Sequence, residues 1–299
     1  MAAGRYIRYR TPRGELAVGA ELVERASGER LHFEELREQE LLDVLGGGAR
    51  TAKAAVTADP ELRALDPGFT LVRPLDPPEV WCAGVTYERS RDARVEESVV
   101  KDAYALVYEA RRPELFLKDA ACRRTVGPGE PIGIRDDATW TVPEPEIALV
   151  LGERGAILGL TIGNDVSSRD IEGANPLYLP QAKVYAGACA IGPAVYVPDE
   201  LEAPLRIRMR ILDSSGRVVF EGETSTARLR RSYAELVRWL LLDNPVPAGS
   251  VLLTGTGLVP PDDVTLVPGH LVEISVPEIG TLVNPVVRAA ELMERSTEP

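Results

Sequence analysis

A Pro-Glu-Pro-Glu motif at residues 143–146 leads directly into an apolar segment that ends at Leu151. Proline fixes the backbone angle φ and biases the preceding residue toward extended conformations, so the motif begins a strand. Residues i and i+2 of a strand share a face, which places Glu144 and Glu146 on one side, roughly 7 Å apart along the backbone. Two carboxylates at that spacing repel each other unless a positive group lies between them.

A third acidic residue stands at the end of the next apolar segment. Residues 157–163 form a run of strand length, and Asp165 follows it. A carboxylate at the end of a buried strand is unfavourable without a partner. Glu144, Glu146 and Asp165 together form the donor set of a hard dication, with Mg²⁺ preferred and Mn²⁺ or Ca²⁺ as substitutes. The Pro-Glu-Pro-Glu motif alone would fit a solvated strand edge better, but Asp165 shifts the interpretation toward a metal site.

The composition disfavours several other classes of protein. The 299 residues are 44% hydrophobic and 27% charged, as in ordinary globular proteins, and the formal net charge of −12 argues against nucleic acid and anionic membranes as partners. Three widely spaced cysteines form no CxxC pair, and no signal peptide or membrane-span run is found, so a cytoplasmic location is expected. The two histidines, His32 and His270, lie outside the acidic region, which disfavours His-dependent catalytic triads and His-liganded zinc.

A Pro-rich segment at residues 74–78 predicts a linker between a small N-terminal domain, residues 1–76, and a catalytic domain, residues 77–299. Many short strands and few helices, without regular βαβ alternation, indicate a β-rich α+β fold. Strands are expected at residues 5–10, 15–23, 69–73, 79–83, 113–118, 157–163, 205–212, 218–222 and 250–253, with two or three more in 262–292. Helices are expected at residues 33–45, 99–110 and 229–240, and a long ordered loop at residues 175–183.

Lys183 is a candidate for chemistry beside the acids. It stands between small or apolar neighbours, and a partly buried lysine has a lowered pKa and can act as a base at neutral pH. A surface lysine whose stem crosses an apolar patch is equally compatible with the sequence. Glu114, Phe116 and Lys118 alternate on one strand face and could line a pocket, although the spacing favours a solvated cross-strand charge pattern. The Thr-Gly-Thr-Gly segment at residues 254–257 fits either a carboxylate-binding loop or a simple glycine turn.

Several motifs follow one another along the chain: Gly84-Val-Thr-Tyr87, Pro143-Glu-Pro-Glu146, Asn164-Asp-Val-Ser-Ser-Arg-Asp170, Lys183 and Leu253-Thr-Gly-Thr256. In this order and spacing they resemble the motifs of the fumarylacetoacetate hydrolase superfamily. The resemblance implies a β-roll catalytic fold, Mg²⁺ held by Glu144, Glu146 and Asp165, and a 2-oxo acid substrate facing Lys183 and Thr256. It also implies a homodimer or homotetramer.

The sequence departs from the hydrolases of this superfamily at the base that activates water. Those members carry a histidine three residues after the tyrosine of the Gly-x-x-Tyr motif and a glutamate three residues further on, where this chain has Ser90 and Ala93. The chain instead resembles the 2-keto-3-deoxy-D-arabinonate dehydratase branch, and this similarity extends into the N-terminal domain. It is carried by residues 76–81, 112–118, 140–146, 175–181 and 243–247.

The branch resemblance implies a metal-dependent hydro-lyase that converts 2-keto-3-deoxy-D-arabinonate into 2,5-dioxopentanoate through a metal-stabilised enolate. Lys183 is the candidate base for the C3 proton, or the group that steadies the enolate oxygen. Glu114 is the candidate acid for loss of the C4 hydroxyl, because a carboxyl group in an apolar site keeps its proton. The roles of these two residues are interchangeable. Thr86, Phe116, Lys183 and Thr256 are the candidate substrate contacts.

Three other functions are compatible with the same residues. A hydrolase of acylpyruvates or diketo acids would need an Asp or Glu from residues 88–97 to activate water. A 2-oxo acid decarboxylase or isomerase would use the same kind of enolate. A non-catalytic metal-binding homologue is disfavoured by the complete acidic set together with Lys183. Activity on a panel of 2-oxo acids separates these possibilities.

Overall fold

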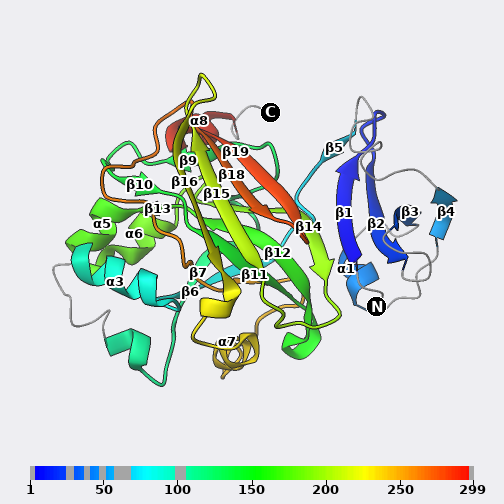
Figure 1. Ribbon diagram of the computed structural model, residues 1–299, viewed down its shortest axis with the longest axis horizontal. Coiled ribbons are helices and arrows are strands. Elements are labelled where there is room, and N and C mark those ends of the chain that lie inside the picture. The colour runs from blue at the N-terminus through cyan, green and yellow to red at the C-terminus, as the bar shows by residue number, and fades with distance from the viewer. Residues whose placement is uncertain are drawn as a thin grey trace.

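Three β-sheets form the framework of the molecule, and the helices are short (Figure 1). The computed structural model describes residues 4–24, 30–36, 41–46, 52–56, 69–97 and 106–295. Within these residues the sheets have twelve, five and two strands. The β-rich α+β class expected from the sequence is therefore confirmed. No helix in these ranges is long and apolar enough to cross a bilayer.

The N-terminal strands extend the largest sheet. Strand β1 pairs antiparallel with β2 on one side and with β14 on the other, where Tyr6 lies opposite Val195. The expected domain boundary at residue 76 falls between β5 and β6, and it stays a prediction. The elements of this region are β1 (Gly4–Arg10), β2 (Leu16–Glu24), β3 (Arg30–Leu36), α1 (Leu41–Leu45), β4 (Ala52–Val56) and β5 (Thr70–Leu71).

The remainder of the largest sheet holds the strands that carry the acidic residues. Its strand order is β4-β3-β2-β1-β14-β12-β11-β17-β6-β7, with β5 paired to β1 and β8 paired to β14. Strand β11 lies between β12 and β17, antiparallel to both, and β6 runs parallel to β17. These strands are β6 (Glu79–Gly84), β7 (Glu114–Ala120), β8 (Thr125–Val126), β11 (Pro145–Leu151), β12 (Ile157–Asp165), β14 (Cys189–Val197) and β17 (Val251–Leu253).

The five-stranded sheet has the order β16-β15-β18-β19-β9, and the two-stranded sheet pairs β10 with β13. The predicted hairpin at residues 205–222 is confirmed as β15 and β16, and the predicted closing strands as β18 and β19. Their bounds are β9 (Ile132–Ile134), β10 (Thr141–Val142), β13 (Ser167–Ser168), β15 (Arg206–Leu212), β16 (Val218–Ser225), β18 (Leu271–Val276) and β19 (Gly280–Arg288).

Strand β11 is buried on both faces. Ile147 and Leu149 belong to a core that β15 and β18 also line, whereas Ala148 and Val150 belong to a second core shared with β1 and α1. This alternation follows from the period of two in a strand, and a run that is apolar at every position is typical of a strand covered on both sides. Glu146 has the same parity as Ala148, so the pleat fixes the side to which its carboxylate points.

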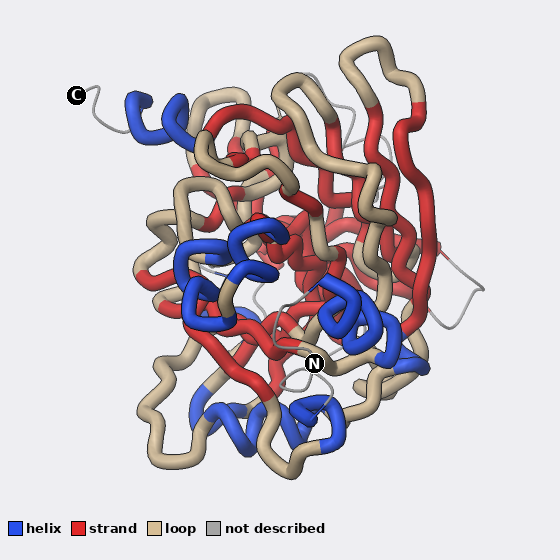
Figure 2. The backbone as a smooth tube through the Cα atoms, turned by 90° about the vertical axis from the view of Figure 1, so that its left-hand side faces the viewer, coloured by secondary structure: helices blue, strands red, loops and turns tan. Residues whose placement is uncertain are grey.

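α3, α5 and α6 gather at one end of the sheets, on the left of Figure 1. Viewed from that end, they lie in front of the strands (Figure 2). α5 packs against both α6 and α3. The helical elements here and beyond are α3 (Glu88–Glu97), η1 (Glu153–Gly155), α5 (Arg169–Ala174), η2 (Pro176–Tyr178), α6 (Leu179–Lys183), η3 (Thr226–Arg228), α7 (Tyr233–Leu240) and α8 (Ala289–Arg295).

The structure corrects two expected elements. The helix expected at residues 33–45 is a strand up to Leu36, because that segment pairs with β2, and among the described residues of this range α1 is the helical part. Pairing with a neighbouring strand overrides a weak helical preference. The loop expected at residues 175–183 is instead η2 followed by α6. Asn175 begins it by accepting a hydrogen bond from the Leu177 N–H, with Pro176 at the first helical position.

Of the two other expected helices, one is confirmed and the other lies largely outside the described residues. The helix expected at 229–240 is confirmed as α7, which begins later because Ser232 caps it by accepting a hydrogen bond from the Glu235 N–H at 3.1 Å. Most of the helix expected at residues 99–110 lies outside the described residues. In the part of this range that is described, residues 106–109 are helical.

Candidate active site

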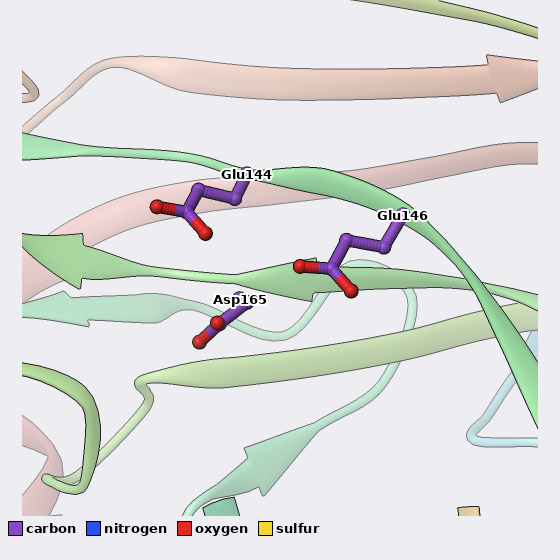
Figure 3. Close-up of side chains that lie close together, drawn as sticks. All are labelled: Glu144, Glu146 and Asp165. Atoms are coloured by element: carbon purple, nitrogen blue, oxygen red, sulfur yellow. The ribbon is translucent and has the colours of Figure 1, made fainter. Parts of the chain in front are cut away.

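Three carboxylates meet where β11 begins and β12 ends. Glu144 and Glu146 flank Pro145, which lies opposite Asn164 in the antiparallel pair, so Asp165 comes next to them. The backbone N–H of Asp165 donates to the Glu144 carbonyl at 3.0 Å, which fixes this junction. Each carboxylate places an oxygen within 4.8 Å of the others. Figure 3 shows the two glutamates extending on the same side of the chain, toward Asp165.

Three cationic side chains surround these acids, and all six are buried. Lys183 Nζ donates to Glu144 Oε2 at 2.9 Å, to Asp165 Oδ2 at 2.8 Å and to Ser167 Oγ at 2.5 Å. Lys118 forms an ion pair with Asp165, and Arg169 pairs with Glu144 at 2.9 Å. Burying an ion without compensation is unfavourable by roughly several kcal/mol. The cluster is therefore held together by its own opposite charges.

Glu146 differs from the other two acids. Its Oε2 accepts a hydrogen bond from the Gly255 N–H at 2.6 Å, and no cation of the described chain lies within ion-pair distance. Burial, followed by the charges of Asp165 and Glu144, raises the pKa of Glu146 well above its usual value. A dication held between the three carboxylates would relieve this repulsion.

The chemistry of the donor set fits magnesium. Three carboxylate oxygens are hard ligands, and Mg²⁺ typically takes few protein carboxylates and completes its shell with water or substrate. The nearby thiol of Cys82 is not a competing ligand, because burial and the charges of Asp165 and Glu146 raise its pKa well above the usual value. The site thus suits an oxygen-liganded ion with positions left for a substrate.

The carboxylates open onto a cavity of about 350 Å³. Two candidate residues of the sequence, Glu114 and Phe116 on β7, lie at this cavity together with Lys183. The full lining is Ala83, Gly84, Val85, Ser90, Glu114, Phe116, Glu144, Glu146, Asp165, Arg169, Glu172, Lys183, Gly255 and Thr256.

The loop after β6 shapes one wall of the cavity. Gly84 lies opposite Glu114 in the strand pair, and a Cβ there would fall 2.1 Å from Glu114 Oε2, so only glycine leaves room for that carboxyl group. Val85 follows with φ of 50°, a region that a β-branched residue rarely adopts. Such conformations persist where the surrounding structure enforces them, often at functional sites.

The two candidate threonines have different positions. Thr256 lines the cavity, and its hydroxyl donates to the Pro145 carbonyl at 2.9 Å, which ties the loop after β17 to the acidic motif. Thr86 is buried beside the cavity, and its hydroxyl donates to the Thr254 carbonyl at 2.7 Å. Gly255 has φ of +93°, and a Cβ there would meet the Thr86 hydroxyl at 2.0 Å. A direct substrate contact by either threonine stays a prediction.

Sequence reasoning missed three residues of the site. Lys118, expected in a solvated charge pattern, is fully buried, and its Nζ donates to the Val166 carbonyl at 3.0 Å besides pairing with Asp165. That expectation is wrong because the chain around Asp165 and Val166 lies against the Lys118 side chain. Arg169 and Glu172 are buried at the cavity, although α5 is only six residues long. The sequence signal for these two residues is an Arg and a Glu three positions apart, shortly after the apolar strand that ends at Asp165.

Comparison with known proteins agrees with this geometry. The family model described as fumarylacetoacetate (FAA) hydrolase C-terminal matches residues 79–287. The chain belongs to this family. Ser90, at the position of the hydrolases' histidine, lines the cavity from α3, and its hydroxyl donates to the Tyr87 carbonyl at 2.7 Å. Ala93, at the position of their glutamate, is buried.

Two curated relatives are dehydratases of sugar acids. The chain is 47% identical over 228 residues to the 2-dehydro-3-deoxy-D-arabinonate dehydratase of Saccharolobus solfataricus, covering 74% of this chain and 76% of the relative. It is 50% identical over 214 residues to a probable 2-keto-3-deoxyxylonate dehydratase of Haloferax volcanii, covering 71% of this chain and 73% of the relative.

A solved structure of similar fold contains a metal and a small ligand. This is 2-keto-3-deoxy-D-arabinonate dehydratase complexed with magnesium and 2,5-dioxopentanoate, which is 38% identical with a TM-score of 0.81 and covers 95% of this chain and 99% of its own. A 5-carboxymethyl-2-hydroxymuconate delta-isomerase from Mycobacterium smegmatis is more distant, at 28% identity and a TM-score of 0.66, with coverage of 95% and 99%.

Proposed function

We propose that the protein is a magnesium-dependent dehydratase that converts 2-keto-3-deoxy-D-arabinonate into 2,5-dioxopentanoate. The observation that carries this proposal is the group of Glu144, Glu146 and Asp165, which converge at one cavity with Lys183 and Glu114. The similarity to two sugar-acid dehydratases supports the choice of substrate class. Ser90 and Ala93 support dehydration over hydrolysis, because neither side chain can activate water as a histidine–glutamate pair does.

The reaction removes a proton from C3 and the hydroxyl from C4 as water, which leaves a C3–C4 double bond next to the C2 carbonyl. A proton then moves from C5 to C3, and the resulting C4–C5 enol tautomerises to the C5 aldehyde, which is the second carbonyl group. Glu144, Glu146 and Asp165 would hold Mg²⁺, which when bound supplies Lewis-acid stabilisation of negative charge on the substrate's oxygens. This attraction makes a 2-oxo acid anion compatible with a protein whose formal net charge is −12.

Side chains of the protein itself would accept and donate the protons. Lys183 would take the C3 proton or stabilise the oxygen that gains charge. Glu144 and Asp165, two of the proposed metal-binding residues, accept hydrogen bonds from Lys183, so a bound dication would compete for those oxygens and loosen the contacts of the lysine. Glu114, in the space left open by Gly84 and beside Phe116, would donate the proton that leaves with the C4 hydroxyl.

The direct test is turnover of the purified protein with Mg²⁺ and a set of 2-keto-3-deoxy pentonates and hexonates, with a 2,5-dioxopentanoate-type product detected by mass spectrometry. We expect dehydration that is lost on treatment with EDTA and restored by Mg²⁺ or Mn²⁺. Acylpyruvates serve as the comparison, since carbon–carbon cleavage of these compounds without dehydration of the sugar acids would replace the proposal by the hydrolase alternative.

Glu114→Gln is expected to separate the two halves of the reaction. The amide cannot donate a carboxyl proton, so dehydration should fall by about 10²- to 10⁴-fold, while exchange of the C3 protons in deuterated water continues. Product formation is followed by mass spectrometry and exchange by NMR. Dehydration at the wild-type rate would remove Glu114 from the mechanism.

We also propose that the protein acts in the cytoplasm as a homodimer or homotetramer. The support is the family resemblance, and light scattering of the purified protein measures its oligomeric state.

A further inference from the structure

Glu172 is a buried carboxylate at the cavity that neither the metal site nor the proposed proton transfers use. The residue is 2% exposed and lines the cavity. It follows Arg169 by three residues on α5, so the two side chains share a helix face and are displaced by about 4.5 Å along its axis. Because Arg169 reaches Glu144, α5 presents one polar group at the carboxylate cluster and a second one almost a turn away from it.

Two polar side chains other than the three metal-site carboxylates share the cavity with Glu172 from neighbouring elements. α3 packs against α5 and contributes Ser90 to the same cavity, and β7 contributes Glu114. A carboxyl group has about four acceptor positions on its two oxygens, so it can accept hydrogen bonds from more than one donor. A substrate tail that carries hydroxyl groups supplies matching donors, whereas an apolar or acyl tail supplies none.

We propose that Glu172 accepts a hydrogen bond from a hydroxyl group at the end of the substrate remote from the carboxylate cluster. It thereby selects 2-oxo acids with a hydroxylated tail over those with an apolar or acyl tail. This inference rests on the proposed function, because a substrate anchored at Glu144, Glu146 and Asp165 is what brings its tail to α5. Glu172 lines the same cavity as these three carboxylates.

Glu172 could instead act only through its neighbour. As the i+3 partner of Arg169 it would orient the guanidinium group that pairs with Glu144, and so it would support the metal site. The two roles differ in a measurable way. A residue that supports the metal site affects every substrate and the affinity for the ion, whereas a residue that binds a hydroxyl group affects only substrates that carry one.

The experiment compares wild-type protein with Glu172→Gln and Glu172→Asp on two compounds. One is 2-keto-3-deoxy-D-arabinonate, assayed for dehydration, and the other is 2-oxobutanoate, which lacks hydroxyl groups, assayed for C3 proton exchange in deuterated water. Mn²⁺ affinity is measured by electron paramagnetic resonance. Glu153→Gln, which alters an exposed glutamate in η1, is the matched control.

We expect Glu172→Gln to lower kcat/KM for the sugar acid by about 10- to 100-fold, as for loss of a charge-assisted hydrogen bond. Exchange of 2-oxobutanoate and Mn²⁺ affinity should stay within about twofold of the wild-type values. Glu172→Asp, which keeps the charge, should lose less. Unchanged kcat/KM overturns the inference, as does a parallel loss of exchange and Mn²⁺ affinity. If wild-type protein neither dehydrates the sugar acid nor exchanges 2-oxobutanoate, the proposed function itself fails.

Discussion

Replacing Lys183 with methionine is expected to abolish exchange of the substrate's C3 protons and, with it, dehydration. The ammonium group donates to Glu144, Asp165 and Ser167, and so it contacts two of the three clustered carboxylates. Loss of a positioned acid–base group lowers rates by about 10²- to 10⁴-fold. The measurement is NMR of C3 exchange in deuterated water, together with the rate of product formation.

Lys183→Arg separates the two roles proposed for the lysine. An arginine keeps the positive charge but stays protonated in proteins, so it can stabilise a charged oxygen but cannot accept the C3 proton. Exchange lost in both variants supports the base, and exchange retained in the arginine variant supports charge stabilisation. Wild-type exchange in the methionine variant would contradict both roles. Far-ultraviolet circular dichroism and Mn²⁺ binding show whether each variant keeps its fold and its metal site.

The metal-binding motif could be predicted because it depends on local geometry. The prolines at positions 143 and 145 and the period of two in a strand determine that Glu144 and Glu146 share a side, whatever the rest of the chain does. Asp165 could be placed beside them because it ends the next apolar strand, and consecutive strands commonly pair. The β-rich class followed from the same alternation in many short segments.

The cationic half of the site depended on contacts that are distant in the sequence. Lys118 on β7 pairs with Asp165 on β12, which is 47 positions later in the sequence. These two strands are not neighbours in the sheet. Nothing in the alternation around Lys118 distinguishes a side chain buried against another element from a solvated one. Arg169 and Glu172 lie on α5, which is too short to produce a recognisable helical period.

The same reason explains the two elements that were predicted wrongly. Residues 33–36 carry a helical pattern, but they pair with β2 on one side and β4 on the other, and the pattern says nothing about these partners. In residues 175–183 the two prolines suggested a loop, yet Pro176 and Pro180 both lie in the first turn of a helical element, where proline lacks no hydrogen bond.

The charges of the site divide the acids into two kinds. Glu144 and Asp165 each have cationic partners in the described chain, namely Arg169, Lys183 and Lys118. Glu146 has the backbone N–H of Gly255 instead, which compensates a full negative charge only in part. Of the three ligands, Glu146 therefore gains the most from a bound dication, and its replacement tests the metal assignment most directly.

Glu146→Gln is expected to have opposite effects on activity and on the stability of the metal-free protein. Removing one of three carboxylates should weaken Mn²⁺ binding and lower Mg²⁺-dependent dehydration by at least about 100-fold, since even residues that only contact metal ligands contribute 10- to 100-fold. In the metal-free protein, the raised pKa of Glu146 means that its ionised form opposes folding at neutral pH. The neutral amide removes this repulsion, so the variant should unfold at the same or a higher temperature than wild type.

The contrast is measured by thermal unfolding with EDTA and with Mg²⁺ at pH 7. The folded-state pKa of Glu146 is raised, so its destabilising effect is absent below the unfolded-state pKa and develops as the pH rises above it. The difference between variant and wild type in EDTA should therefore shrink as the pH is lowered toward 4. Mg²⁺ should stabilise wild type by mass action but leave the variant almost unchanged. Equal stabilisation of both proteins by Mg²⁺, with turnover intact in the variant, would show that the three carboxylates are not the metal site.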